Sequence, residues 1–132
     1  HGHGHGHGHD HSRDHDETSR GTHGKGVVSV SVSAPAEQPV VLAKFQKWVA
    51  ALVEERWRDL YRIKGVLSVR GSDRIYVFQG VCGELKGQYQ RAWREGEMRC
   101  SEIVFIGCDL VHSTLEQQFL ACTAAHGAKK EL

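Results

Sequence analysis

The residues with the clearest chemistry lie at the start of the chain, where histidine alternates with glycine. The opening HGHGHGHGHDHSRDHD places seven histidines within fifteen residues. In an extended backbone, side chains at i and i+2 point the same way, so two or three imidazoles can converge on one ion. Imidazole binds zinc, copper and nickel, and carboxylates nearby supply oxygen ligands. The predicted metal ligands are His1, His3, His5, His7, His9, His11 and His15, together with Asp10 and Asp14.

This segment is predicted to bind zinc loosely, and other divalent transition metals as well. Its glycines let the backbone wrap around an ion but give no preformed geometry. Imidazole coordinates only when neutral, so binding should fail below about pH 6.5. Two alternatives remain: a flexible linker without a metal role, and a purification tag. The alternation of histidine and glycine gives way gradually to the mixed polar sequence SRDHDETSRGTHGKG, which favours a native segment over a tag.

The rest of the chain offers little catalytic chemistry. It lacks GxxxxGK[ST], GxSxG and HExxH motifs. Only His112 and His126 lie outside the first 26 residues, and neither has a candidate nucleophile beside it. Both are therefore interpreted as structural or solvent-facing. The chain alone is not expected to be an enzyme.

The four cysteines form neither a CxxC pair nor a dense disulfide framework. They are Cys82, Cys100, Cys108 and Cys122. This usage predicts free, mostly buried thiols in a reducing compartment. We therefore expect an intracellular location, in the cytoplasm or a plastid.

Composition divides the chain of 132 residues into one domain and two flanks. Residues 1–26 contain no Ala, Val, Ile, Leu, Met, Phe, Trp, Tyr or Cys, which predicts a disordered arm. Residues 27–127 form the expected domain, and 128–132 a disordered tail. A net charge of +1 argues against a nucleic-acid partner, and no apolar run approaches the length of a membrane span. Because the chain begins with His and has no signal peptide, we expect it to be part of a longer protein.

Periodicity predicts the elements that must position any docking surface. Alternation of apolar and polar residues indicates strands at 27–33 and 60–70, and two segments that are apolar on both faces, 74–83 and 102–108, indicate two more. Helical spacing indicates a helix from Pro39 to about Arg56, and a Ser113–Glu116 capping box indicates the start of a second helix. Residues 84–100 are polar and are expected to be irregular, with Trp93 anchoring them to the domain.

The resulting order, β-α-β-β-β-α, predicts an α+β fold: a two-layer sandwich with helices on one face of a mainly antiparallel four-stranded sheet. Arg62, Lys64, Ser68 and Arg70 share a predicted polar strand face. Arg62, Lys64 and Arg70 are the candidate partner-binding residues. The alternative is a solvated face without a partner.

Four stretches, LYRIKGVLSV, YVFQGV, IVFIGCDL and STLEQQF, occur in this order in the folded part. They resemble the C-terminal domain of the CobW family of GTP-dependent metal chaperones, over about residues 27–126. A His-rich segment before this domain is a feature of many family members. The resemblance implies the same fold and a parent protein that delivers metal.

The family's GTP hydrolysis and its cysteine-rich metal site belong to an N-terminal GTPase domain outside this chain. The resemblance therefore implies GTP only as a cofactor of the parent, and no catalytic residue here. The implied partners are that GTPase domain and a metal-client protein, with no nucleic acid or membrane.

One position departs from the family pattern. The family's usual histidine after Gln79-Gly80-Val81 is replaced by Cys82. Cys82 is either a small packing residue or a weak metal ligand, and a site joining it to Cys100 or Cys108 stays open.

Overall fold

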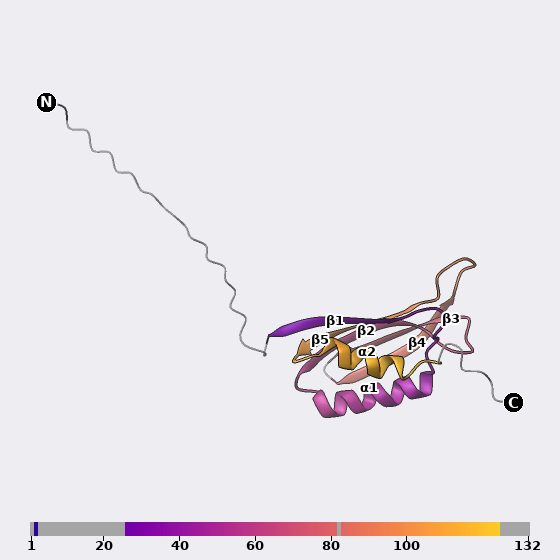
Figure 1. The fold of residues 1–132 in the computed structure, drawn as a ribbon, viewed down its shortest axis with the longest axis horizontal. Helices are drawn as coiled ribbons and strands as arrows, with labels where there is room; N and C mark the ends of the chain where they lie inside the picture. The colour runs from indigo at the N-terminus through magenta and orange to yellow at the C-terminus, as the bar shows by residue number, and fades with distance from the viewer. Residues whose placement is uncertain (1, 3–25, 82, 125–132) are drawn as a thin grey trace.

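The computed structural model describes residues 2, 26–81 and 83–124. Within these ranges five strands form one sheet, and two helices lie together on one of its faces (Figure 1). The elements are β1 (Val27–Ala34), α1 (Leu42–Arg56), β2 (Leu60–Ser68), β3 (Arg74–Val81), β4 (Glu84–Ala92), β5 (Ser101–Cys108) and α2 (His112–Leu120). No helix within these ranges is long and apolar enough to cross a membrane.

The strand order is β1-β5-β2-β3-β4, and every neighbouring pair is antiparallel. The predicted α+β class, the antiparallel sheet and the helices on one face are therefore confirmed. The predicted arm and tail lie outside the described residues, apart from Gly2 and Gly26.

The predicted number of strands is wrong, because residues 84–100 are not irregular throughout. Glu84–Ala92 forms β4, which pairs with β3. Its residues are exposed on both faces except Leu85, which is partly buried. A strand that buries so little carries almost no apolar pattern, so its composition resembles that of a loop. The pairing with β3, rather than side-chain burial, holds it in the sheet.

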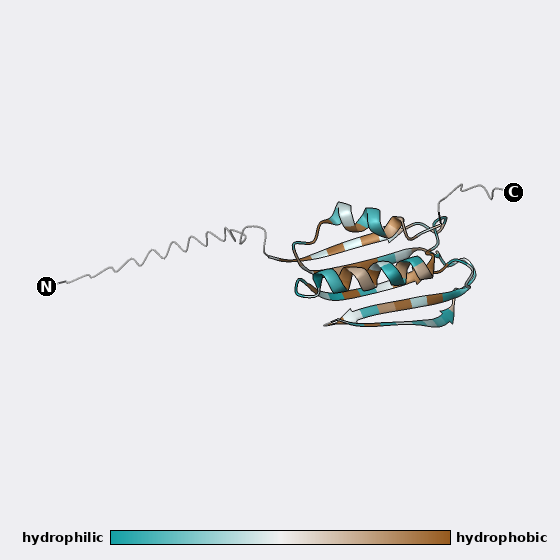
Figure 2. Ribbon diagram, turned by 90° about the horizontal axis from the view of Figure 1, so that it is seen from below, coloured by the Kyte–Doolittle hydropathy of each residue, from teal (hydrophilic) through white to brown (hydrophobic). Residues whose placement is uncertain are grey.

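The core lies between the helices and the sheet. Val30 and Val32 of β1 are buried on this side, as the predicted alternation requires, and so are Ile103 and Phe105 of β5. Aromatic rings fill the centre: Phe45 of α1 meets Phe78 edge to face, with ring centroids 5.1 Å apart. Figure 2 views this side and shows apolar stretches on the helices above apolar stretches of the strands. Such edge-to-face contacts add to the stabilisation from burial.

Both helices begin at positions other than those predicted. α1 begins at Leu42, because Val40 first forms bridges to Val69 and Thr123 in an extended conformation. α2 begins at His112 with Val111 at its N-cap and no side-chain capping bond, so the predicted capping box is wrong. Glu116 instead lies one turn from His112, with Oε2 and Nδ1 3.4 Å apart.

Candidate functional site

The face of the sheet that points away from the helices is the candidate site, and we call it the open face. Paired residues of neighbouring antiparallel strands place their side chains on the same face, so the registers define rows across the sheet. The central row contains Ser31, Val104, Lys64, Gln79 and Lys86. The rows on either side contain Ser29, Ile106, Arg62, Val81 and Glu84, and Ser33, Glu102, Val66, Val77 and Gln88. The open face therefore mixes valine and isoleucine with separated charges.

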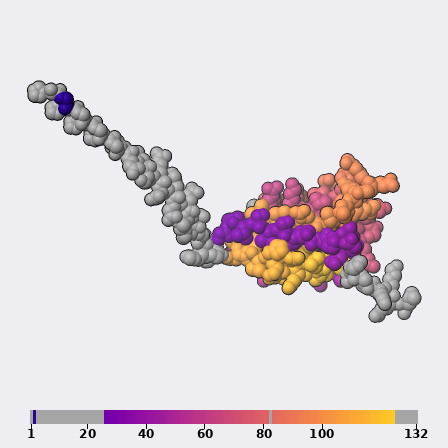
Figure 3. All heavy atoms as spheres, turned by 45° about the horizontal axis from the view of Figure 1, so that its top comes forward, coloured from indigo at the N-terminus to yellow at the C-terminus, as the bar shows by residue number. Residues whose placement is uncertain are grey.

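A pocket of about 330 Å³ lies on this face beside the connection between β4 and β5. We call this connection, residues 93–100, the arch; it projects from the sheet in Figures 1 and 3. Trp93 and Met98 of the arch form one wall, and Val66 and Val104 lie on the sheet side. Lys64 and Glu102 add opposite charges to the lining. Met98 is 70% exposed, so much of this apolar surface faces solvent.

An ion pair braces the arch. Arg91 donates two hydrogen bonds to Glu97, at 2.9 and 2.8 Å, and the backbone N–H of Arg94 donates a third at 2.9 Å. These bonds lower the pKa of Glu97 to about 2. The side-chain hydrogen bonding from Arg91 has the largest effect, followed by the bond from the Arg94 backbone. The same contact raises the pKa of Arg91. The arch therefore keeps a defined shape beside the pocket at neutral pH.

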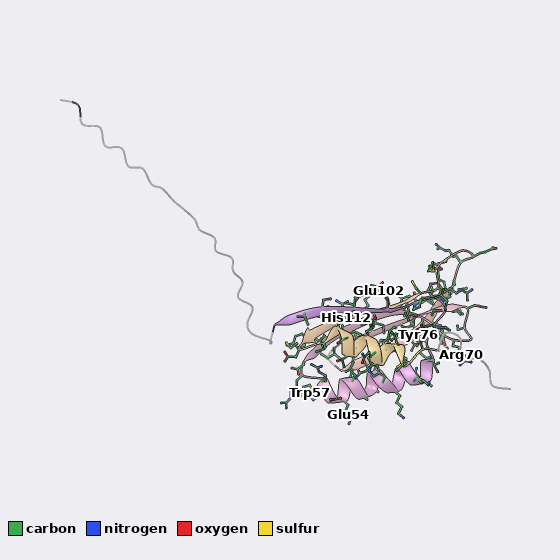
Figure 4. The ribbon with its side chains drawn as sticks, viewed as in Figure 1. Glu54, Trp57, Arg70, Tyr76, Glu102 and His112 are labelled. Atoms are coloured by element: carbon green, nitrogen blue, oxygen red, sulfur yellow. The ribbon has the colours of Figure 1, made fainter. Side chains whose placement is uncertain are left out.

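The structure separates the predicted partner-binding residues. Arg62 and Lys64 are exposed on the open face, but Ser68 is buried and its backbone N–H donates to Ser101 Oγ. Arg70 lines a different hollow, beside Lys44 near the start of α1. In Figure 4, Glu102 lies on the open side of the sheet and Arg70 lies at one end, near the start of α1. The predicted common face is therefore wrong for Arg70, whereas Ser68 keeps its place in the alternation of β2 but is buried there.

The predicted alternation fails at the two ends of β2, at Tyr61 and at Arg70. A register shift between Leu60 and Arg62 leaves Tyr61 exposed, although its expected partners on one face, Ile63 and Leu67, are buried. β2 ends at Ser68, and the chain then turns beside Val40. A strict period of two holds only within an unbroken ladder.

Every predicted metal ligand lies outside the described residues: His1, His3, His5, His7, His9, His11, His15, Asp10, Asp14 and Cys82. Within the part of the chain that the structure describes, no three His, Cys, Asp or Glu side chains form a group that could hold a metal ion. His112 is solvent-facing, as predicted, with 57% of its side chain exposed. His126 is also outside the described residues.

The three described cysteines are free, as predicted, but only Cys122 is buried. Burial raises the pKa of its thiol. Cys108 Sγ lies 3.2 Å from the hydroxyl of Tyr61, and this hydrogen bond raises the pKa of that phenol. Cys100 precedes β5 and Cys108 is its last residue, so the rise of an extended strand places them about 26 Å apart. One ion therefore cannot bind both of them.

Sequence reasoning misses two parts of the open face. The polar composition predicts an irregular segment around Lys86, although Lys86 and Gln88 alternate with Leu85 and Tyr89 in a weak strand pattern. No sequence pattern marks Met98. Trp93 is expected to anchor residues 84–100, and it does line the pocket beside Val66. Its Nε1–H is buried with no hydrogen-bond partner among the described residues.

Known proteins resemble this fold and sequence. The family model "Cobalamin synthesis protein cobW C-terminal domain" matches residues 29–123. Two solved structures are similar: Zn(II)-bound YjiA GTPase from E. coli and a Zn(II)-bound triple mutant of YjiA. Each is 27% identical, with a TM-score of 0.66, and the match covers 73% of this chain and 29% of theirs. No curated protein sequence gives a significant match.

The fold defines a small α+β domain in which one face of the sheet is not covered by the two helices. The family match spans most of the chain, so the chain belongs to the CobW C-terminal domain family. The resemblance seen in the sequence is thereby confirmed. The chain spans 29% of the length of the YjiA structures that it matches.

Proposed function

We propose that this chain is the accessory C-terminal domain of a CobW-type, GTP-dependent zinc chaperone. Its open face docks the parent's GTPase domain or a metal-client protein, and its His-rich segment captures zinc. The family match over residues 29–123 carries the proposal. GTP hydrolysis takes place in the GTPase domain, and this chain contributes docking and metal capture.

The pocket beside the arch supports the docking role. Protein interfaces concentrate their energy where an apolar side chain fills a desolvated pocket surrounded by polar groups. The pocket has this form, with Val66, Val104 and Trp93 around it and Lys64 and Glu102 in its lining. The brace between Arg91 and Glu97 holds one wall in place before a partner arrives, which lowers the entropic cost of binding.

The sequence of the first fifteen residues supports zinc capture. Closely spaced imidazoles and carboxylates favour borderline metal ions such as zinc. The related YjiA structures are described as Zn(II)-bound. The ligands act without a fixed cage, so the ion exchanges readily and can pass to the GTPase domain or to a client.

Zinc titration calorimetry on the full chain tests metal capture. We expect several ions to bind at pH 7.5 and far fewer at pH 5.5, where imidazole is protonated. Replacing His1, His3, His5, His7, His9, His11 and His15 with Gln should abolish this binding, whereas the control His112→Gln should leave it unchanged. Undiminished zinc binding in the seven-fold variant would refute the proposed site and favour the linker role.

Binding of the parent's separately expressed GTPase domain tests docking. Val66→Asp places a charge beside the pocket on an exposed strand position, so the domain should still fold. We expect it to weaken binding by about tenfold or more. Arg70→Glu, on a different surface, is the matched control and should change affinity little. Equal losses in the two variants would exclude the open face as the docking surface.

A further inference from the structure

The outer edge of β1 has the features of a strand that accepts a partner. Within the described residues β1 pairs only with β5, over eight residues and without a register shift. Its sequence, VVSVSVSA, contains no charged residue and no proline. Natural proteins usually protect such an edge with charges, proline, a bulge or a covering segment, because its unpaired N–H and C=O groups attract other strands. Figure 3 shows β1 as a continuous band at the surface.

The opposite edge of the sheet carries the protection that β1 lacks. β4 contains Glu84, Lys86 and Arg91, and a register shift interrupts its pairing with β3 between Arg74 and Tyr76. Charges and irregular pairing both discourage edge-to-edge contact. The two edges of one sheet therefore differ in their readiness to pair.

We infer that β1 pairs antiparallel with β1 of a second copy of this chain, joining two sheets into one across a two-fold axis. Antiparallel partners place directly opposed side chains on the same face. With the axis at Val30, Val28 lies opposite Val32 of the partner subunit, and Ser29 lies opposite Ser31 of the partner subunit. The alternation of valine and serine makes the strand complementary to itself in this register, as an isologous interface requires.

Exposed side chains on β1 favour an uncharged partner strand. Val27 is 61% exposed and Val28 is 41% exposed at the start of the strand. Pairing in this register covers part of this apolar surface. A charged partner strand would find no opposite charge among the eight residues of β1, whereas a second β1 matches the apolar positions Val28 and Val32 and the hydroxyl positions Ser29 and Ser31.

This pairing goes beyond the proposed function and requires no metal. Edge pairing extends the sheet in its own plane, so the open face remains free. Both open faces then lie on the same side of the joined sheet. The dimer offers two docking surfaces side by side.

Sedimentation equilibrium of the full chain tests the inference, with a chelator present so that zinc cannot cross-link the His-rich segments. We expect reversible dimers to form between about 1 and 300 µM, the range of a small interface. A chain that remains monomeric throughout this range would overturn the proposal.

Two variants with substitutions at the same positions test the register. Ser29→Lys with Ser31→Lys opposes like charges across the axis, and we expect dimer affinity to fall by about tenfold. Ser29→Glu with Ser31→Lys opposes unlike charges, and its affinity should equal or exceed that of the native chain. Ser31 Oγ donates to Glu102 at 3.1 Å, so the substitution Ser31→Lys, common to both variants, brings an ammonium group to the same carboxylate within each monomer.

Gln88→Lys with Gln90→Lys is the matched control. It adds two lysines to exposed positions of β4, as Ser29→Lys with Ser31→Lys adds two to β1. Its dimer affinity should be unchanged. Equal weakening of both β1 variants would contradict the proposed register. Loss of the dimer in the β4 control, with the β1 variants intact, would assign the contact to the other edge.

Discussion

β1 and β4 are the two edge strands of one sheet, but different forces hold them in place. β1 buries Val30, Val32 and Ala34 beneath the helix layer, where α2 packs against it. β4 is exposed on both faces along almost its whole length. It is held by its pairing with β3, by the contact between Tyr89 and Tyr76, and by the braced arch that follows it.

This difference shows how burial and edge chemistry are linked. A strand fixed by buried side chains stays in place without charges, so its outer backbone edge can remain open to a partner. A strand fixed mainly by backbone pairing has both faces in solvent and can carry the charges that discourage association. The edge at β1 can therefore accept a partner strand, whereas the charges on β4 discourage pairing at the opposite edge.

The largest expected effect comes from removing the support beneath β1. Phe119 of α2 is fully buried, with its ring centroid 6.3 Å from that of Phe45. Phe119→Ala should lower the free energy of unfolding by about 3–5 kcal/mol, because it leaves a cavity in the core. Tyr89→Ala on β4, where the side chain is 43% exposed, should cost much less. Urea denaturation measures both, and equal losses would contradict the contrast between the edges.

A smaller effect is expected from crowding β4 against β3. A Cβ atom at Gly87 would overlap the hydroxyl and ring of Tyr76, which is 5% exposed. Gly87→Ala should therefore displace the ring or the strand, at a cost of about 1–3 kcal/mol in unfolding free energy. Gln88→Ala, at the next residue, is the control and should change thermal stability little. An unchanged melting temperature in Gly87→Ala would contradict the close packing of Gly87 against Tyr76.

The smallest effect concerns the arch and pH. The folded-state pKa of Glu97 is lowered to about 2, so its stabilising contact is complete above the ordinary carboxyl pKa and is lost as pH falls through the folded value. Carboxyl NMR should place the midpoint of Glu97 near 2, and the arch should loosen over that interval. Glu97→Gln should loosen the arch at neutral pH, whereas Glu95→Gln should not. A Glu97 midpoint near the ordinary carboxyl value would contradict the brace.

The same contrast explains which parts of the fold could be predicted from sequence. β1 alternates clearly because one face is buried, β5 is recognised as a short run that is apolar on both faces, and the first helix shows its apolar stripe at Phe45, Val49 and Leu52. β4 escapes prediction because a strand with both faces exposed to solvent carries only a weak hydrophobic alternation. The predicted α2 start is misplaced because a Ser-x-x-Glu pattern can occur inside a helix as well as at its cap.

The candidate site is less predictable than the fold. Alternation alone places Lys64 and Arg62 on an exposed strand face, and they lie there. The pocket joins Lys64 to Met98 and Trp93, which are distant in sequence and come together with the sheet only through the arch. No local pattern encodes that contact. The role of the His-rich segment rests on its sequence and remains a prediction.

Hydrogen exchange of the full chain at two concentrations tests the difference between the edges most directly. With chelator present, backbone amides of β1 and β4 are compared at about 5 and about 300 µM. Backbone amides of β1 that point away from β5 should become more protected from exchange at the higher concentration. Backbone amides of β4 that point away from β3 should show unchanged protection. Protection of β1 that is independent of concentration, or a gain in protection confined to β4, would contradict the account.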